Sequence, residues 1–98
     1  MKQAFTGFDP AFEHRARLAI AVLLARHGEV SFAGFKQQLD LTDGNLGAQL
    51  RRLEDEGYVE LRRDFVERKP VTWYRLTAQG NDALKRHLAA LQQLIGAG

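Results

Sequence analysis

Apolar residues recur at helical spacing early in the chain, between residues that favour helix ends. Asp9 can cap a helix, and Pro10 fits a first helical turn, where its missing N–H costs nothing. Gly28 suits the position that ends a helix. The apolar positions between them are Phe12, Ala16, Ala19, Ile20, Leu23 and Leu24. Their spacing predicts an amphipathic helix over residues 9–27.

Two shorter helices are expected next, over residues 31–40 and 42–56. Ser31 and Thr42 stand just before each apolar series, and their side-chain oxygens are suited to capping a helix. The two series are Phe32, Phe35 and Leu39, followed by Leu46, Leu50 and Leu53. Val30, ahead of the first helix, belongs to a short extended segment.

Residues 58–66 carry apolar side chains at alternate positions and residues 71–76 are rich in β-forming residues, so residues 58–76 are expected to form a β-hairpin. Val59, Leu61 and Phe65 occupy alternate positions of the first strand. The polar run ERKP at residues 67–70 predicts the turn, and β-rich residues follow it.

A final helix is predicted over residues 77–95, with Thr77 as its cap. Its apolar residues step by four, three and four positions: Leu84, Leu88, Leu91 and Ile95. This is coiled-coil-like spacing, although the stripe is too short to demand a coiled coil.

The predicted order is helix, strand, helix, helix, strand, strand, helix, in a mainly α fold with a small β-hairpin. A chain of 98 residues fits a single domain, residues 1–98. Two short helices joined by a tight turn form a helix-turn-helix, whose second member can enter the major groove of DNA. A hairpin directly after it can reach the neighbouring backbone or the minor groove.

Several protein classes are excluded by what the sequence lacks. Without cysteine there is no disulfide framework, thiol nucleophile or thiolate metal site. No phosphate loop or nucleophile elbow is present, so we expect neither an enzyme nor a cofactor. His14 and His87 are the one pair worth testing for a metal, and they would need carboxylates across a dimer. The sequence contains no apolar run of about 18 residues and no signal-peptide core, so we expect a cytoplasmic protein with no membrane contact.

The net charge is only +2, but it is unevenly distributed. Residues 58–98 hold seven Lys and Arg against four Asp and Glu, whereas residues 1–57 hold seven against eight. The excess is concentrated in Arg62, Arg63, Arg68, Lys69 and Arg75. A local basic patch fits a polyanion partner, although basic hairpins also occur on inert surfaces.

The segment LTDGNLGAQLRRLEDEGYVELRRDFVERKPVTWYRLTAQG, residues 41–80, resembles the winged helix-turn-helix transcriptional regulators of the MarR/ArsR type. It is most similar to the small bacterial winged helix DNA-binding domain group. That group carries LTDGNLSxHLxxLExxGYVE, then a hairpin called the wing, then TxYRLTxxG. The opening FDP and the segment SFAGFKQQLDLT also match, so the resemblance covers about residues 8–95. It implies a DNA-binding repressor or activator, usually a homodimer, in the bacterial cytoplasm.

The sequence departs from the family pattern in three places. Gly47 and Ala48 stand where a small polar or a longer basic residue is expected, which leaves fewer side chains to read bases. Glu67 stands where glycine often precedes Arg-Lys-Pro, and its carboxylate repels phosphate. Trp73 replaces a residue that is more often threonine.

The resemblance makes residues 42–56 the recognition helix and residues 58–76 the wing. Asn45 and Gln49 lie one turn apart, and either amide can bond adenine bidentately. Arg68, at the tip of the wing, is expected to reach the minor groove. The other DNA-contact candidates are Thr42, Asp43, Gly44, Ala48, Arg51, Arg52, Arg62, Arg63 and Lys69.

These residues also have a purely structural interpretation. Asn45 and Gln49 fit a solvated helix face, and Arg52 can pair with Glu56 four residues further on. In the hairpin, the candidate ion pairs join Arg62 or Arg63 with Glu60 or Asp64.

The last helix is expected to join two copies of the chain. One small module makes too few contacts to specify a DNA site, whereas a two-fold dimer reads half-sites about 34–36 Å apart. The predicted dimer contacts are Phe5, Phe8, Leu84, Leu88, Leu91 and Ile95. The alternative is that this stripe only completes the core of its own chain.

The sequence therefore predicts a sequence-specific regulator that binds double-stranded DNA as a homodimer. The runner-up is a winged helix that docks onto another protein, a role that the low net charge would suit. The chain has no room for a separate effector domain, so a small-molecule inducer would have to bind at the dimer interface or between helices.

Overall fold

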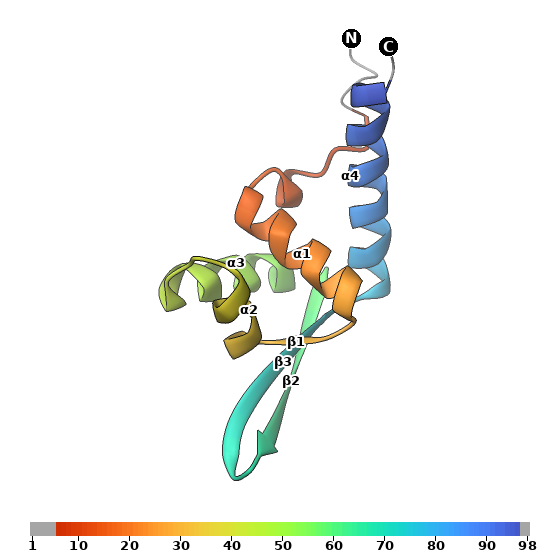
Figure 1. Cartoon of the computed structure of the whole chain (residues 1–98). Helices are drawn as coiled ribbons and strands as arrows, with labels where there is room; N and C mark the ends of the chain where they lie inside the picture. The colour runs from red at the N-terminus through yellow and green to blue at the C-terminus, as the bar shows by residue number, and fades with distance from the viewer. Residues whose placement is uncertain (1–5, 97–98) are drawn as a thin grey trace.

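The computed structural model describes residues 6–96, and its helices and strands follow the predicted order. The elements are η2 (Pro10–Phe12, a 3-10 helix), α1 (Arg15–His27), β1 (Val30–Ser31), α2 (Phe32–Gln38), α3 (Asp43–Asp55), β2 (Val59–Val66), β3 (Lys69–Leu76) and α4 (Ala78–Gly96). The hairpin of β2 and β3 extends from one end of the helical body and α4 from the other (Figure 1). The mainly α fold with a small hairpin is confirmed.

The predicted first helix over residues 9–27 is wrong at its start, because the chain makes a separate 3-10 turn there. Asp9 caps that turn, and its Oδ1 accepts the N–H two residues further on at 2.9 Å. His14 is then extended, with φ −83° and ψ 120°, and its side chain caps α1. The interruption turns Phe12 into the core, where its ring stacks on Tyr58 with 5.5 Å between centroids.

The two helices of the helix-turn-helix are confirmed, with shorter ends than predicted. The Ser31 Oγ and Thr42 Oγ1 atoms accept the N–H groups three residues further on at 3.0 and 3.1 Å, so both expected caps are present. The first of these helices, α2, ends at Gln38 rather than at residue 40 because Leu39 is extended, with φ −119° and ψ 137°.

The three strands form an antiparallel sheet in the order β1-β3-β2. The predicted four-residue turn of the hairpin is wrong, since Lys69 and Pro70 are already paired in β3. Glu67 and Arg68 alone make the turn, with φ of 52° and 68°. Two positive φ values give a two-residue turn the twist that matches its flanking strands, which explains the tight connection.

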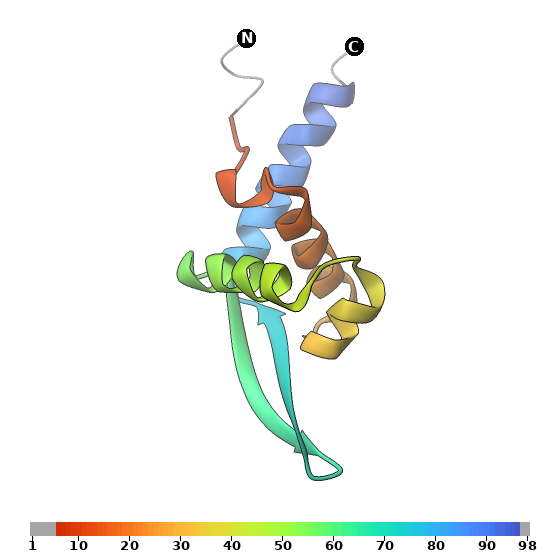
Figure 2. The ribbon, with the colours of Figure 1, turned by 90° about the vertical axis from the view of Figure 1, so that its left-hand side faces the viewer.

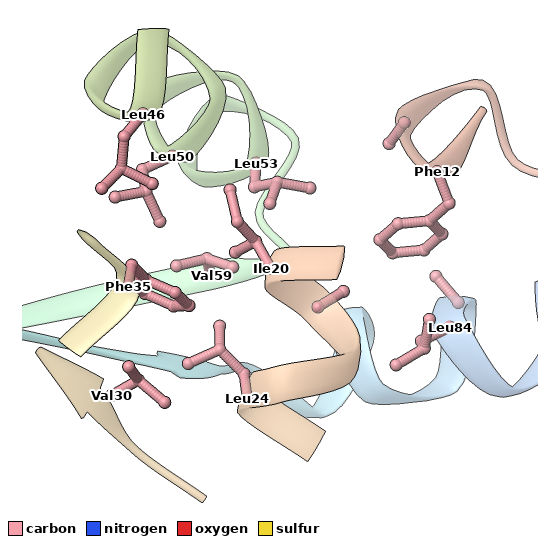
Figure 3. Close-up of a cluster of buried hydrophobic side chains, with 13 residues drawn as sticks. Phe12, Ile20, Leu24, Val30, Phe35, Leu46, Leu50, Leu53, Val59 and Leu84 are labelled. Carbon is pink, nitrogen blue, oxygen red and sulfur yellow. The ribbon is translucent and has the colours of Figure 1, made fainter. Parts of the chain in front are cut away.

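The core lies between α1, α3, the base of the hairpin and the first half of α4 (Figure 3). Leu46, Leu50 and Leu53 form the predicted buried seam of α3, and none is more than 2% exposed. The other large side chains of the cluster are Phe12, Ile20, Leu24, Val30, Phe35, Val59 and Leu84. This packing fixes α3 by one side and leaves its opposite side at the surface.

The last helix, α4, begins at the predicted cap. Thr77 Oγ1 accepts the N–H of Gly80 at 2.9 Å and donates to the carbonyl of Gly57 at 2.6 Å. A Cβ at Gly80 would lie 2.0 Å from the carbonyl oxygen of Tyr58, so only glycine allows this close approach. Within residues 6–96, none of the helices combines the length and apolarity needed to span a membrane.

Candidate nucleic-acid interface

The face of α3 opposite its leucine seam lies at the surface and brings together the residues predicted to contact bases. In Figure 2 no other element lies in front of this helix. Added Cβ atoms at Gly44 or Gly47 would meet no other atom within 4 Å, so the surface there is open. Gln49 is half-buried, and the other candidates on α3 and its cap are exposed: Thr42, Asp43, Gly44, Asn45, Ala48, Arg51 and Arg52.

A hydrogen-bond relay connects α1 to this face. Arg17 Nη1 donates to Gln49 Oε1 at 2.7 Å, and Gln49 Nε2 donates to Asn45 Oδ1 at 3.0 Å. Arg17 is absent from the predicted site. Its bond to Gln49 spans 32 positions of the chain, so no local pattern could reveal it.

The turn between α2 and α3 is fixed by Lys36. Its ammonium donates to the carbonyl of Leu41 and forms an ion pair with Asp43 Oδ1 at 3.0 Å. The Asp43 side chain remains 78% exposed. Lys36 therefore offsets a negative charge that would otherwise repel a phosphate backbone near the start of α3.

Four of the predicted cations make no ion pair among the residues that the structure describes. Arg51 and Arg63 line one groove between α3 and the hairpin, together with Glu54, Leu61 and Tyr74. The other two are at the tip of the wing, where Arg68 is in the turn and Lys69 is the first residue of β3. These charges are free to meet an anion from solvent.

Arg62 lies on the opposite side of the wing from Arg63, because successive strand residues point to opposite faces. Its guanidinium forms two hydrogen bonds to Glu29, at 2.8 and 2.9 Å, and one to Asp64 at 3.0 Å. These bonds raise the pKa of Arg62, and the hydrogen bond from Arg62 lowers the pKa of Glu29. The Arg62 guanidinium carbon also lies 5.6 Å from the ring centroid of Trp73.

Two further arginines form ion pairs, of which the structural interpretation of the sequence predicted only the first. Arg52 pairs with Glu56 at 3.3 Å, as its spacing indicated. Arg75 pairs with Glu60 at 2.6 Å. The back of the wing is therefore a network of paired charges, whereas Arg51 and Arg63, on the side towards α3, form no ion pair among the described residues and share their groove with Glu54.

The predicted dimer contacts separate into four groups. Phe5 lies outside the described residues. Leu84 is 2% exposed and packs in the core of its own chain, so its assignment to a dimer contact is corrected. Phe8 is half-buried, with its ring edge-on to His87 at 5.2 Å. Where α4 extends past the helical body, the stripe reaches the surface at Leu88, Leu91 and Ile95, with Leu94 beside them.

The two histidines proposed as a metal pair have separate local partners. His87 is buried, and its Nδ1 accepts the N–H of Asp9 at 3.0 Å. His14 Nδ1 accepts the N–H of Ala16 at 3.1 Å at the start of α1. Residues 6–96 contain no group of three or more His, Cys, Asp or Glu side chains placed to hold a metal ion.

An exposed helix-turn-helix followed by a hairpin and a further helix is the architecture that the sequence resemblance predicted. Residues 16–95 match the family model described as "Winged helix DNA-binding domain". The chain belongs to this family. The resemblance of residues 41–80 to winged helix-turn-helix transcriptional regulators is thereby confirmed.

Relatives of this winged helix occur in archaea and bacteria. The uncharacterized protein MJ0432 of Methanocaldococcus jannaschii is 32% identical over 83 residues, which cover 85% of this chain and 90% of the relative. The uncharacterized HTH-type transcriptional regulator YwhA of Bacillus subtilis is 28% identical over 94 residues, or 96% of this chain and 67% of the relative. The solved structure of the transcriptional regulator homologue protein from Pyrococcus horikoshii OT3 has a TM-score of 0.89 and 28% identity, with 99% and 97% of the two chains covered. The likeness therefore includes both the wing and α4.

Proposed function

We propose that this winged helix is a cytoplasmic, sequence-specific transcriptional regulator that places α3 in the major groove and the wing on the backbone or in the minor groove. The observation that carries the proposal is that Arg51 and Arg63, which form no ion pair among the described residues, lie in one groove beside α3. Small residues let the start of α3 approach base edges, and Arg51 and Arg63 line a groove beside the later part of the same helix. The major groove of B-DNA, about 12 Å wide, admits one α-helix.

Phosphate contacts supply most of the salt-dependent affinity of such proteins, and they also set the register on DNA. Arg51, Arg63, Arg68 and Lys69 are suited to this role, because none of them forms an ion pair among the described residues. Arg62 is less suited, since it is bound to Glu29 and Asp64 behind the wing. We therefore leave Arg62 out of the proposed phosphate contacts.

The proposed active form is a homodimer joined through the projecting half of α4. Ile95 is 75% exposed and Leu94 is 46% exposed, and both lie beyond the part of α4 that packs on the core. A partner helix would cover this stripe and place two copies of α3 on one face of the duplex. An Ile95→Asp substitution should shift sedimentation from dimer to monomer, whereas Gln93→Asp, which is exposed on the other side of the same helix, should not. A monomeric wild-type protein at micromolar concentration would contradict this part of the proposal.

The decisive experiment for the DNA-binding function is selection of bound duplexes from a random pool, followed by affinity measurement on the enriched sequence. The expected result is a pseudo-palindrome with half-sites about 34–36 Å apart. Arg51→Gln should weaken binding to all sequences, whereas Lys85→Gln, on the exposed surface of α4, should not. Failure to enrich any duplex would contradict the proposal.

One observation favours a second function, docking onto another protein. Phe65 is 72% exposed and Val66 is 47% exposed near the wing tip, where a protein partner could cover them. The salt dependence separates the two functions, because DNA binding weakens steeply with salt and apolar docking does not.

A further inference from the structure

We propose that Arg17 fixes the orientation of two amides on α3 and thereby makes the helix prefer guanine; this inference rests on the proposed DNA-binding function. Arg17 would act as a positioning residue behind the interface. Asn45 would be the residue that contacts the base, with support from Gln49.

The relay sets the direction of each amide unambiguously. A guanidinium has donors and no acceptor, so the Gln49 atom 2.7 Å from Arg17 Nη1 must be the carbonyl oxygen. The Gln49 Nε2 must then face Asn45, and the atom that accepts from it at 3.0 Å must be Asn45 Oδ1. Each bond polarises the next, so the relay strengthens as a unit.

The guanidinium of Arg17, which begins the relay, is itself held by hydrogen bonds to backbone carbonyls. Its Nε donates to the carbonyl of Ala11 at 2.7 Å, and Nη2 lies 3.5 Å from the carbonyl of Pro10. The 3-10 helix η2 therefore fixes the guanidinium, which in turn fixes Gln49. Burial is the main cause that lowers the pKa of Arg17, yet an arginine side chain stays protonated in proteins.

The atoms left for DNA are hydrogen-bond donors. Both N–H bonds of Asn45 Nδ2 and one N–H of Gln49 Nε2 have no partner among the described residues, and Asn45 is exposed. The neighbouring Gly44 and Ala48 supply no side-chain acceptor. The one acidic side chain in this turn, Asp43, is paired with Lys36.

A surface of donors matches guanine better than the other bases. Guanine presents two acceptors, N7 and O6, in the major groove, whereas adenine presents one acceptor and one donor. Bidentate binding of adenine would require the Asn45 carbonyl, which is turned towards Gln49, to accept a second hydrogen bond from the base. The structure therefore revises the sequence-based expectation of adenine contacts to a preference for guanine.

The test uses the duplex enriched from the random pool, with its guanines replaced one at a time. Replacement by 7-deazaguanine removes the N7 acceptor and should weaken binding about five-fold or more at the contacted position. Replacement of the same guanine by inosine keeps N7 and O6, so binding there should change less than two-fold. Asn45→Asp replaces the donor by an acceptor, so the preference at that position should change from guanine to cytosine.

Arg17 is tested by its effect on base preference. Arg17→Met should reduce the guanine-over-adenine ratio at that position by about five-fold or more, because both amides are then free to flip. Arg17→Lys should restore part of the ratio, since an ammonium also donates. Arg26→Met removes the same charge from the same helix and should leave the ratio unchanged. Thermal unfolding establishes that each variant is folded.

The outcomes separate this inference from the proposed function. A wild-type protein that retains no duplex overturns both. Enriched sites that lack guanine, or a contacted guanine that is insensitive to 7-deaza replacement, overturn the guanine preference alone. A base ratio in Arg17→Met equal to that of the wild type overturns the positioning role. If Arg17→Met does not fold, the ratio measured for Arg17→Lys decides that role: a ratio below that of the wild type supports it, and a ratio equal to that of the wild type overturns it.

Discussion

At the residue scale, three polar groups join the start of the chain to the base of the wing and to α4. The Tyr58 hydroxyl donates to Asp9 Oδ2 at 2.5 Å, and the Asp9 N–H donates to His87 Nδ1 at 3.0 Å. Phe12 packs against both rings, with centroid distances of 5.5 Å to Tyr58 and 5.6 Å to His87. The first described residues are therefore held against the wing and α4 by specific bonds as well as by burial.

This cluster predicts a loss of stability at high pH. The hydrogen bond to Asp9 raises the pKa of Tyr58 to about 12, from 10. A raised pKa means that the folded state holds the proton more tightly, so the contribution is complete below pH 10 and is lost as the pH rises towards 12. The free energy of unfolding should therefore fall across this range, by about 1 kcal/mol from this hydrogen bond. Urea titrations of wild type and Tyr58→Phe at both ends of the range measure it, and an equal fall in both proteins would contradict the assignment.

Alanine substitutions at two glycines should have opposite effects on the stability of the fold. Gly80→Ala should destabilise the fold by about 1–3 kcal/mol, because its Cβ would meet the backbone of Tyr58, which cannot move aside easily. Gly47→Ala should stabilise the fold by about 0.5–1 kcal/mol, since it lies inside α3 with no atom near the new methyl group. Chemical denaturation compares the two. Equal effects would show that helix propensity, and not the contact, governs both positions.

The sequence allowed some of these residues to be predicted and not others, and the reason is distance along the chain. The caps Ser31, Thr42 and Thr77 act on N–H groups three residues away, so local spacing revealed them. Arg17 acts on a residue 32 positions away, and Asp9 on one 78 positions away. Only the assembled fold brings such partners together.

At the element scale, the wing ends in a turn that its residues do not favour. Glu67 and Arg68 adopt φ of 52° and 68°, values that cost roughly 1–2 kcal/mol for each ordinary L-residue. Hairpin turns of this kind usually contain Asn and Gly. The tight turn holds Arg68 at the far end of the wing. A longer loop at this position would leave Arg68 less constrained.

Glu67→Asn should therefore improve both folding and DNA binding. Asparagine accepts positive φ more readily, so the fold should gain about 0.5 kcal/mol or more. Removal of a carboxylate beside Arg68 should tighten DNA binding about two-fold. Glu67→Gln is the matched control, because it removes the charge without relieving the backbone. If both substitutions raise the melting temperature equally, the backbone explanation is wrong.

Whole elements were predictable where the pattern that defines them is local. The leucine spacing of α3 and the alternation of β2 both met this condition. The break in the helix at His14 was not predictable from a local pattern, because it accompanies the contact of Phe12 with Tyr58 across the fold. The length of the hairpin turn was not predictable either, since it is set by the register of β2 against β3.

At the scale of the whole molecule, the distribution of charge matters more than the net charge of +2. Behind the wing, Arg62 and Arg75 are neutralised by Glu29, Asp64 and Glu60. On the side towards α3, the arginines are unpaired. A nearly neutral protein can therefore present a positive surface in one direction only, which would orient it on DNA during encounter.

This arrangement predicts the salt dependence of DNA binding. Each neutralised phosphate contributes about −0.9 to the slope of log K against log salt concentration. The four unpaired cations Arg51, Arg63, Arg68 and Lys69 would give about −3.6 for one protomer and about −7 for two, so the slope also reports the oligomeric state. Arg63→Gln should make the slope of a dimer shallower by about 2, whereas Arg75→Gln should leave it unchanged because Arg75 already pairs with Glu60. Fluorescence anisotropy between 50 and 300 mM salt would measure these slopes. Equal changes in the two variants would mean that both faces of the wing meet phosphate, and the one-sided surface would have to be abandoned.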